Sequence, residues 1–156
     1  MAAFPTNYQN MKRYFSKNER ETIGLAKKIA GRLKGGEVLL LQGELGAGKT
    51  TFVKGLAQAF GIKERITSPT FVLMHQHRIK DKGLRIKYFV HCDAYRVKSA
   101  RELGDVGLID WLGKPDTLVV VEWGEKIKPL LRGKKYTTIK FQHGKKENER
   151  IITIRA

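Results

Sequence analysis

A glycine-rich segment behind a short apolar run is the feature that most constrains the fold of this chain. Residues 43–50 read GELGAGKT and follow directly on the apolar run VLLL at 38–41. The pattern is G-x-x-x-x-G-K-[ST], the phosphate-binding loop (P-loop, or Walker A motif), in the strand-then-helix context that it requires. It predicts a buried parallel strand, a tight turn around a phosphate, and a helix that begins near Lys49.

Each residue type in this loop has a chemical task. Glycines at 43, 46 and 48 let the backbone turn tightly and bring its N–H groups onto a phosphate. Lys49 places a positive charge at the β- and γ-phosphates, and Thr50 offers a hydroxyl to Mg²⁺. The N-terminus of the following helix adds its positive dipole end. We therefore predict a nucleotide-binding site, because the preceding strand argues against an incidental glycine-rich turn.

Composition indicates one globular domain. The chain has 156 residues, so we expect residues 1–156 to form a single domain, with residues 1–11 flexible. No apolar run reaches about 18 residues, and residues 1–10 lack the pattern of a signal peptide, so we expect no membrane segment. The single cysteine, Cys92, excludes an intrachain disulfide and favours the reducing cytoplasm. We expect it to be a packed thiol rather than a reactive one.

The net charge of +16 is spread along the chain. Residues 1–60 carry +6, residues 61–112 carry +4, and residues 113–156 carry +6. Such a spread indicates a broadly positive surface, suited to RNA or to an acidic partner protein. A solvated, lysine-rich surface adapted to the host cell accounts for the charge equally well, because no RNA-binding motif accompanies it.

Hydrophobic patterns outside the loop predict the remaining elements. A capping box from Ser16 to Glu19 is expected to start a helix that runs to Leu33. We expect strands over 12–15, 37–42 and 118–121, hairpins pairing 71–79 with 84–92 and 136–143 with 150–155, and helices over 49–60, 99–103 and 109–112. This order predicts an α/β fold of the P-loop NTPase type, a three-layer sandwich whose mixed central sheet includes antiparallel hairpins.

Three polar clusters follow predicted strands, where the sites of α/β proteins collect. Ser68-Pro69-Thr70 suits either a loop that senses a γ-phosphate or a plain proline turn. Asp93 suits either the positioning of a metal or water, or the N-cap of a helix. Glu122 ends an apolar strand, which is the Walker B pattern for a carboxylate that fixes Mg²⁺. The four histidines show no metal-ligand spacing, and we assign them no role.

In this order and spacing, the clusters resemble the TsaE family. The matching segments are GELGAGKTTF at 43–52, TSPTF at 67–71, DAYR at 93–96 and VEW at 121–123, together with ETIGLA at 21–26 and the pairs at 102–103 and 107–108. The resemblance covers roughly residues 12 to 130. The loop alone occurs in many families, whereas the ordered set is specific.

The resemblance implies an Mg²⁺-dependent ATPase that works with two partners, TsaB and TsaD. These proteins make threonylcarbamoyladenosine beside the anticodon of tRNAs that read ANN codons. TsaD transfers the group, while TsaE hydrolyses ATP, slowly when alone, to reset the complex. Contact with tRNA is therefore expected to be indirect, through the complex, although direct contact is compatible with the charge.

The family's functional residues fall on specific positions of this sequence. Asp93 and Glu122 correspond to its catalytic acids, and Thr50 with Glu122 to its Mg²⁺ ligands. Its nucleotide-binding positions correspond to Gly46, Ala47, Gly48, Lys49, Thr50 and Thr51, with Thr22 beside the adenine. Two features depart from the family: Glu44 replaces the commoner Asp, and the charge of +16 is high, which bears on partner docking rather than on the chemistry.

Two other functions remain open from the sequence. A small P-loop kinase would pass phosphate to a metabolite, but the predicted hairpin at 71–92 stands where such kinases usually carry an arginine-rich helical lid. A nucleotide-gated RNA-binding module without turnover suits the positive charge, whereas Asp93 and Glu122 argue against it. The rate of ATP turnover, with and without partner proteins, separates these possibilities.

Overall fold

The structure is a computed structural model that describes residues 11–67 and 72–156. Residues 1–10, expected to be flexible, and the Ser68-Pro69-Thr70 cluster lie outside the described residues. No helix in the described ranges is long and apolar enough to cross a membrane.

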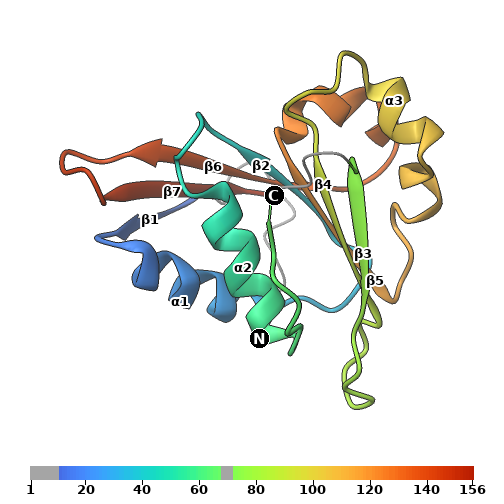
Figure 1. Ribbon diagram of the computed structural model, residues 1–156, viewed down its shortest axis with the longest axis horizontal. Coiled ribbons are helices and arrows are strands. Elements are labelled where there is room, and N and C mark those ends of the chain that lie inside the picture. Colours follow the sequence, from blue (N-terminus) through green and yellow to red (C-terminus); the bar gives the residue numbers. More distant parts are fainter. Residues whose placement is uncertain (1–10, 68–71) are drawn as a thin grey trace.

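A mixed seven-stranded sheet forms the middle of the molecule, in the order β1-β7-β6-β2-β5-β4-β3 (Figure 1). The strands are β1 (Lys12–Ser16), β2 (Val38–Gln42), β3 (Met74–Arg78), β4 (Tyr88–Asp93), β5 (Thr117–Glu122), β6 (Thr137–His143) and β7 (Arg150–Arg155). The adjacent strands β4, β5, β2 and β6 run parallel, and β3, β7 and β1 are antiparallel to their neighbours. The P-loop strand therefore lies in the parallel centre, as its unbroken apolar sequence predicted.

Helices cover both faces of the sheet and make three layers. Helices α1 (Glu19–Ala30) and α2 (Lys49–Ala59) pack on one face, and α3 (Ala100–Asp105) with the 3₁₀ segments η1 (Leu108–Asp110) and η2 (Gly124–Leu131) on the other (Figure 1). Alternate residues of each central strand feed separate cores: Leu39 and Leu41 of β2 pack toward α2, whereas Val38 and Leu40 pack toward α3. The expected three-layer α/β sandwich is confirmed.

The start of α1 corrects one prediction. Asn18, not Ser16, is the N-cap: its side chain accepts a hydrogen bond from the backbone N–H of Glu21 at 2.9 Å. Glu21 in turn accepts from the N–H of Lys17 at 2.8 Å, so the bonds are reciprocal as in a capping box, but the returning bond goes to the residue before the cap. Ser16 is instead buried in β1, with its hydroxyl 2.8 Å from that of Thr22. In the sequence alone, a serine at the end of a strand cannot be distinguished from a serine that caps the following helix.

Two further differences from the prediction concern the end of α1 and the segment after β5. Helix α1 ends at Ala30 rather than Leu33, because the chain continues in tighter turns in which Leu33 donates to the carbonyl of Ala30. The 3₁₀ segment η2 was not predicted, since Pro129 interrupts its helical pattern. The hairpins β3–β4 and β6–β7 and the helix after the loop are confirmed.

Candidate nucleotide site

The P-loop connects β2 to α2 at the centre of the sheet. Gly48 is the residue that caps α2, with the left-handed φ of 105°, and no side chain bonds the N-terminus of this helix. Gly43 lies so close to β6 that a Cβ atom there would stand 2.6 Å from the carbonyl oxygen of Phe141. The glycines are therefore required by backbone geometry, and they leave the positive end of an eleven-residue helix facing the cavity.

Lys49 extends across the loop that contains it. Its ammonium group donates to the carbonyl oxygens of Gly43 and, at 2.7 Å, of Glu44, and it lies 4.5 Å from the ring centroid of Trp123. Burial lowers the pKa of Lys49, while Glu122, Asp93, Glu125 and Glu44 act in the opposite direction. A buried cation is thus held among acidic groups where the phosphates of a nucleotide would bring further negative charge.

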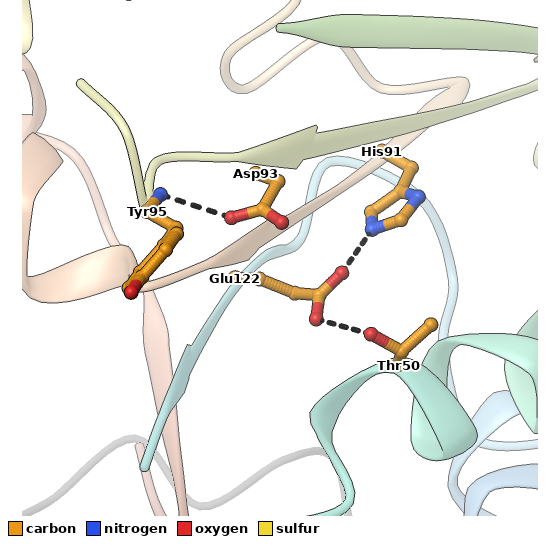
Figure 2. Close-up of polar contacts among 5 residues, drawn as sticks. All are labelled: Thr50, His91, Asp93, Tyr95 and Glu122. Atoms are coloured by element: carbon orange, nitrogen blue, oxygen red, sulfur yellow. Dashed lines mark hydrogen bonds and ion pairs between the residues drawn. The ribbon is translucent and has the colours of Figure 1, made fainter. Parts of the chain in front are cut away.

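Glu122 lies between two elements at the end of β5 (Figure 2). One carboxylate oxygen accepts from the hydroxyl of Thr50 at 2.7 Å, and the other lies 2.6 Å from Nε2 of His91. Glu122 and His91 are only 2% and 0% exposed, so this carboxylate is held away from water. The predicted pair of metal ligands, Thr50 and Glu122, is therefore brought together across 72 positions of sequence.

Asp93 ends β4 next to Glu122. Its Oδ1 accepts from the backbone N–H of Tyr95 at 2.9 Å, which tightens the turn after the strand (Figure 2). The helix N-cap that the sequence allowed is not its role, because α3 is capped by Ser99. Asp93 also lines the same cavity as Lys49 and Thr50, so the turn leaves the carboxylate at the site.

Trp123 forms one wall of the cavity because the chain turns sharply after β5. It is the one non-glycine residue in the described ranges with a positive φ, at 57°. The neighbouring Gly124 explains the turn: a Cβ atom there would lie 2.5 Å from Cβ of Leu40, so the backbone crosses directly over β2. This conformation costs about 1–3 kcal/mol for a residue with a side chain, and such strain is concentrated at functional sites. The indole packs against Tyr95, with ring centroids 5.1 Å apart.

The opposite wall comes from α1 and the β6–β7 hairpin. Thr22, the position expected beside the adenine, lines the cavity although its residue is only 2% exposed. Arg150 donates to the carbonyl oxygen of Gly46 at 3.0 Å and to that of Glu147 at 2.6 Å. It therefore ties the tip of the P-loop to the C-terminal hairpin, 104 positions away in sequence.

These walls enclose a cavity of about 470 Å³, large enough for a nucleotide. The predicted residues that line it are Thr22, Gly46, Gly48, Lys49, Thr50, Thr51, Asp93 and Glu122. Ala47, also predicted, is fully buried beneath the loop and does not line the cavity, since its side chain packs in the core beside Gly43. Ala47 therefore contributes to the loop through its backbone and through a side chain small enough to fit beneath it.

Among the residues to which sequence reasoning gave no part in the site, His91 contacts Glu122, and Asn148 and Arg150 line the cavity. His91 carried a signal, since a polar residue stands among the apolar residues of β4 two positions before Asp93. Arg150 carried none, because only the pairing of β7 with β6 brings the end of the chain to the loop.

The arrangement fits a metal-bound nucleotide on structural grounds. Thr50 and Glu122 present hard oxygen donors of the kind that Mg²⁺ takes beside phosphates. The uncapped N-terminus of α2 and the ammonium group of Lys49 would meet the phosphates. The loop, both acids and the lysine occupy one cavity, so the donor set suits the group that the motif implies.

Comparison with known proteins identifies the family of this chain. Residues 16–152 match the family described as "Threonylcarbamoyl adenosine biosynthesis protein TsaE". The chain is 40% identical over 121 residues to the "tRNA threonylcarbamoyladenosine biosynthesis protein TsaE" of Aquifex aeolicus, covering 76% of this chain and 81% of that protein. The protein of the same name from Bacillus subtilis is 36% identical over 139 residues, with 89% and 82% covered.

A solved structure gives the same result for the fold. The crystal structure of Bacillus subtilis YdiB superposes with a TM-score of 0.72 at 29% sequence identity, covering 93% of this chain and 84% of that one. A match over most of the length, in sequence and in fold, extends beyond the P-loop that many families share. The chain belongs to the TsaE family of tRNA threonylcarbamoyladenosine biosynthesis proteins.

Proposed function

We propose that this protein is an Mg²⁺-dependent ATPase that acts with TsaB and TsaD in the threonylcarbamoylation of tRNA. The observation that carries the proposal is the contact between Thr50 and Glu122, 2.7 Å apart at the mouth of a P-loop. A hydroxyl from the loop helix and a carboxylate from the neighbouring strand are the two protein groups that P-loop ATPases use toward Mg²⁺. Since tRNA is the substrate of the pathway, we place this action in the cytoplasm.

The residues of the site divide the work of hydrolysis. Water attacks the γ-phosphorus, the bond to the β-phosphate oxygen breaks, and ADP, phosphate and a proton leave. Lys49 and the N–H groups of the loop would balance the negative charge of the phosphates. Thr50 and Glu122 would hold Mg²⁺, which would supply further positive charge against the charge that develops during hydrolysis. We assign the orientation of the attacking water to Asp93, which is the register partner of Glu122 at the end of the neighbouring strand.

One feature of the site fits slow turnover in isolation. Lys49 donates hydrogen bonds to carbonyl groups of its own loop, at Gly43 and Glu44, rather than being held free for a phosphate. A stabilising group supplied by a partner accelerates many P-loop enzymes. We therefore propose that the TsaB–TsaD complex changes the rate of hydrolysis, and that hydrolysis in turn resets that complex.

Charge supports docking on an anionic partner. Strands β1, β6 and β7 read KRYFS, TTIKFQH and RIITIR, with five lysines and arginines and no acidic residue. An acidic protein surface is attracted to such a region, and so is tRNA held in the complex. Direct contact with RNA would show as binding to bare tRNA that weakens by roughly 0.7 to 0.9 log units per log unit of salt for each phosphate contact.

The test is ATP turnover measured for the isolated protein and after addition of purified TsaB–TsaD. We expect slow Mg²⁺-dependent hydrolysis alone and an altered rate with the complex, together with co-elution on a sizing column. An unchanged rate and no co-elution would contradict the partner assignment. Phosphate transfer to a metabolite would instead support a kinase, and binding of bare tRNA without any hydrolysis would support an RNA-binding module.

A further inference from the structure

We infer that His91 is a positioning residue for Glu122, fixing the orientation in which this carboxylate meets Thr50 and a bound metal. The inference rests on the proposed function, because it assigns His91 a part in that same site. His91 lies on β4, between β5 and the edge strand β3, and its side chain points toward Glu122 at the end of β5 (Figure 2).

The two oxygens of Glu122 have separate partners. Oε2 lies 2.6 Å from Nε2 of His91, and Oε1 accepts from Thr50 at 2.7 Å. Among the described residues these are the hydrogen-bond partners of this carboxylate. An ionised carboxylate accepts only, so Nε2 must carry the proton of the bond between them. The histidine thus anchors one oxygen and leaves the other directed at the metal-ligand hydroxyl.

Packing alone does not account for a histidine at this position. The side chain of His91 is only 1% exposed, and Nδ1 has no hydrogen-bond partner in the described part of the chain. A buried polar atom without a partner costs about 1–3 kcal/mol, which a leucine or methionine of similar size would avoid. Burying Nδ1 without a partner therefore destabilises the fold. The hydrogen bond from Nε2 to Glu122 is the interaction that offsets this loss.

Orientation of a metal-binding carboxylate requires such a partner. A glutamate side chain has three rotatable torsions, and its neighbours Val120 and Val121 are apolar core residues that offer it no hydrogen bond. Hydrogen bonds from behind hold ligating carboxylates in other metal sites, and their removal typically costs about 10–100-fold in metal affinity or activity. His91 supplies this bond from the adjacent strand, opposite Val120 in register.

The test compares the affinity for ATP in Mg²⁺ with the affinity in EDTA, measured by titration calorimetry on folded protein. We expect His91→Leu to bind ATP in EDTA within about twofold of the unaltered protein, and to lose about 10–100-fold of the apparent affinity for Mg²⁺. His91→Gln places an amide nitrogen near the position of Nε2 and should recover most of this loss. His91→Asn, whose shorter amide nitrogen corresponds to Nδ1, should not.

His77→Leu is the matched control. This histidine lies on β3, also has a buried ring nitrogen without a partner, and contacts Phe89 rather than Glu122. It should leave the Mg²⁺ dependence unchanged. Equal Mg²⁺ affinities in the Gln and Asn variants would overturn the inference. So would an equal loss of ATP affinity by His91→Leu in Mg²⁺ and in EDTA. If His91→Leu does not fold, the comparison of the Gln and Asn variants decides the outcome. An unaltered protein whose ATP binding ignores Mg²⁺ would instead contradict the proposed function.

Discussion

Asp93 and Glu122 are direct partners in the register between the parallel strands β4 and β5, so two carboxylates end neighbouring strands side by side. Their environments differ. Glu122 is buried between His91 and Thr50, whereas the carboxylate of Asp93 accepts from the backbone of its own turn. Like charges this close are tolerated where cations balance them, and Lys49 lines the same cavity. The difference suggests separate roles, Glu122 toward the metal and Asp93 toward the water.

Replacing Glu122 with Gln is expected to leave the fold and ATP binding intact and to lower turnover by about 10² or more. The amide keeps the shape and can still accept from Thr50, but it lacks the charge that a metal ligand contributes. Turnover at saturating ATP, with binding measured separately, checks this. Glu125→Gln is the control: it removes the same charge three residues on, from an exposed side chain outside the cavity. Equal rates in the two variants would contradict the assignment.

Two substitutions at Asp93 separate its structural role in the turn from its role in hydrolysis. Asn retains an oxygen that can accept from the N–H of Tyr95 but removes the charge, and Ala removes both. We expect Asp93→Asn to melt near the unaltered protein yet hydrolyse ATP about 10² times more slowly. Asp93→Ala should in addition lose about 0.5–1.5 kcal/mol of stability. Near-normal turnover in the Asn variant would leave Asp93 only its structural role.

Substituting Ala for Lys49 is expected to abolish measurable ATP binding, because the ammonium group is the one lysine charge that lines the described cavity. We expect little loss of stability from the missing ion pairs. Burial lowers the pKa of Lys49 and so opposes its charged form, which offsets the attraction of the nearby acids. Lys54→Ala is the control. It removes a lysine five residues further along the same helix, outside the lining of the cavity, and should bind ATP normally. Titration of both variants with ATP and Mg²⁺ decides the outcome.

Much of this fold could be predicted because its signals are local. The strand, loop and helix around Lys49 follow from apolar runs and glycines that act within a dozen residues. The two acids were found because each directly follows a buried strand, and the carboxyl ends of parallel strands meet at one edge.

The rest depends on pairings that a sequence does not display. Arg150 reaches Gly46 only because β7 pairs with β6, which in turn pairs with β2. His91 acquires a role only when β4 and β5 lie in parallel register, which sets it against Glu122. The N-cap was placed at Ser16 rather than Asn18 because both residues carry suitable side chains, and the end of β1 decides between them.

Cys92 should resist modification in the folded protein. Burial, and secondarily Asp93, raises the pKa of this thiol to about 12. Its thiolate fraction at pH 8 is therefore far below that of an ordinary cysteine, and we expect a disulfide reagent to react at least about 100-fold more slowly than with unfolded chain. Ala59→Cys, which adds an exposed thiol on α2, should react rapidly and is the control.

The same shift predicts a dependence of stability on pH. A thiol pKa raised in the folded state contributes stability that is fully present below the unfolded value, near 8.5, and is lost as pH rises toward 12. We therefore expect Cys92→Ala to remove part of the alkaline loss of stability between these values. Denaturant unfolding across that range measures it, and identical alkaline slopes in the two proteins would contradict the prediction.

Arg150 is expected to hold the P-loop in its binding conformation. Its guanidinium joins the carbonyl oxygen of Gly46 to the β6–β7 hairpin, and it lines the cavity that would take the nucleotide. Arg150→Gln should weaken ATP binding about tenfold, since a hydrogen bond from a charged group contributes about 1.5–3 kcal/mol and this one is partly exposed. Arg155→Gln removes the same charge from the other end of β7, where the side chain contacts Met11, and should change ATP affinity little. If both variants lose affinity equally and the loss disappears at high salt, the effect is general attraction by positive charge, and the hydrogen bond to Gly46 has no specific part in nucleotide binding.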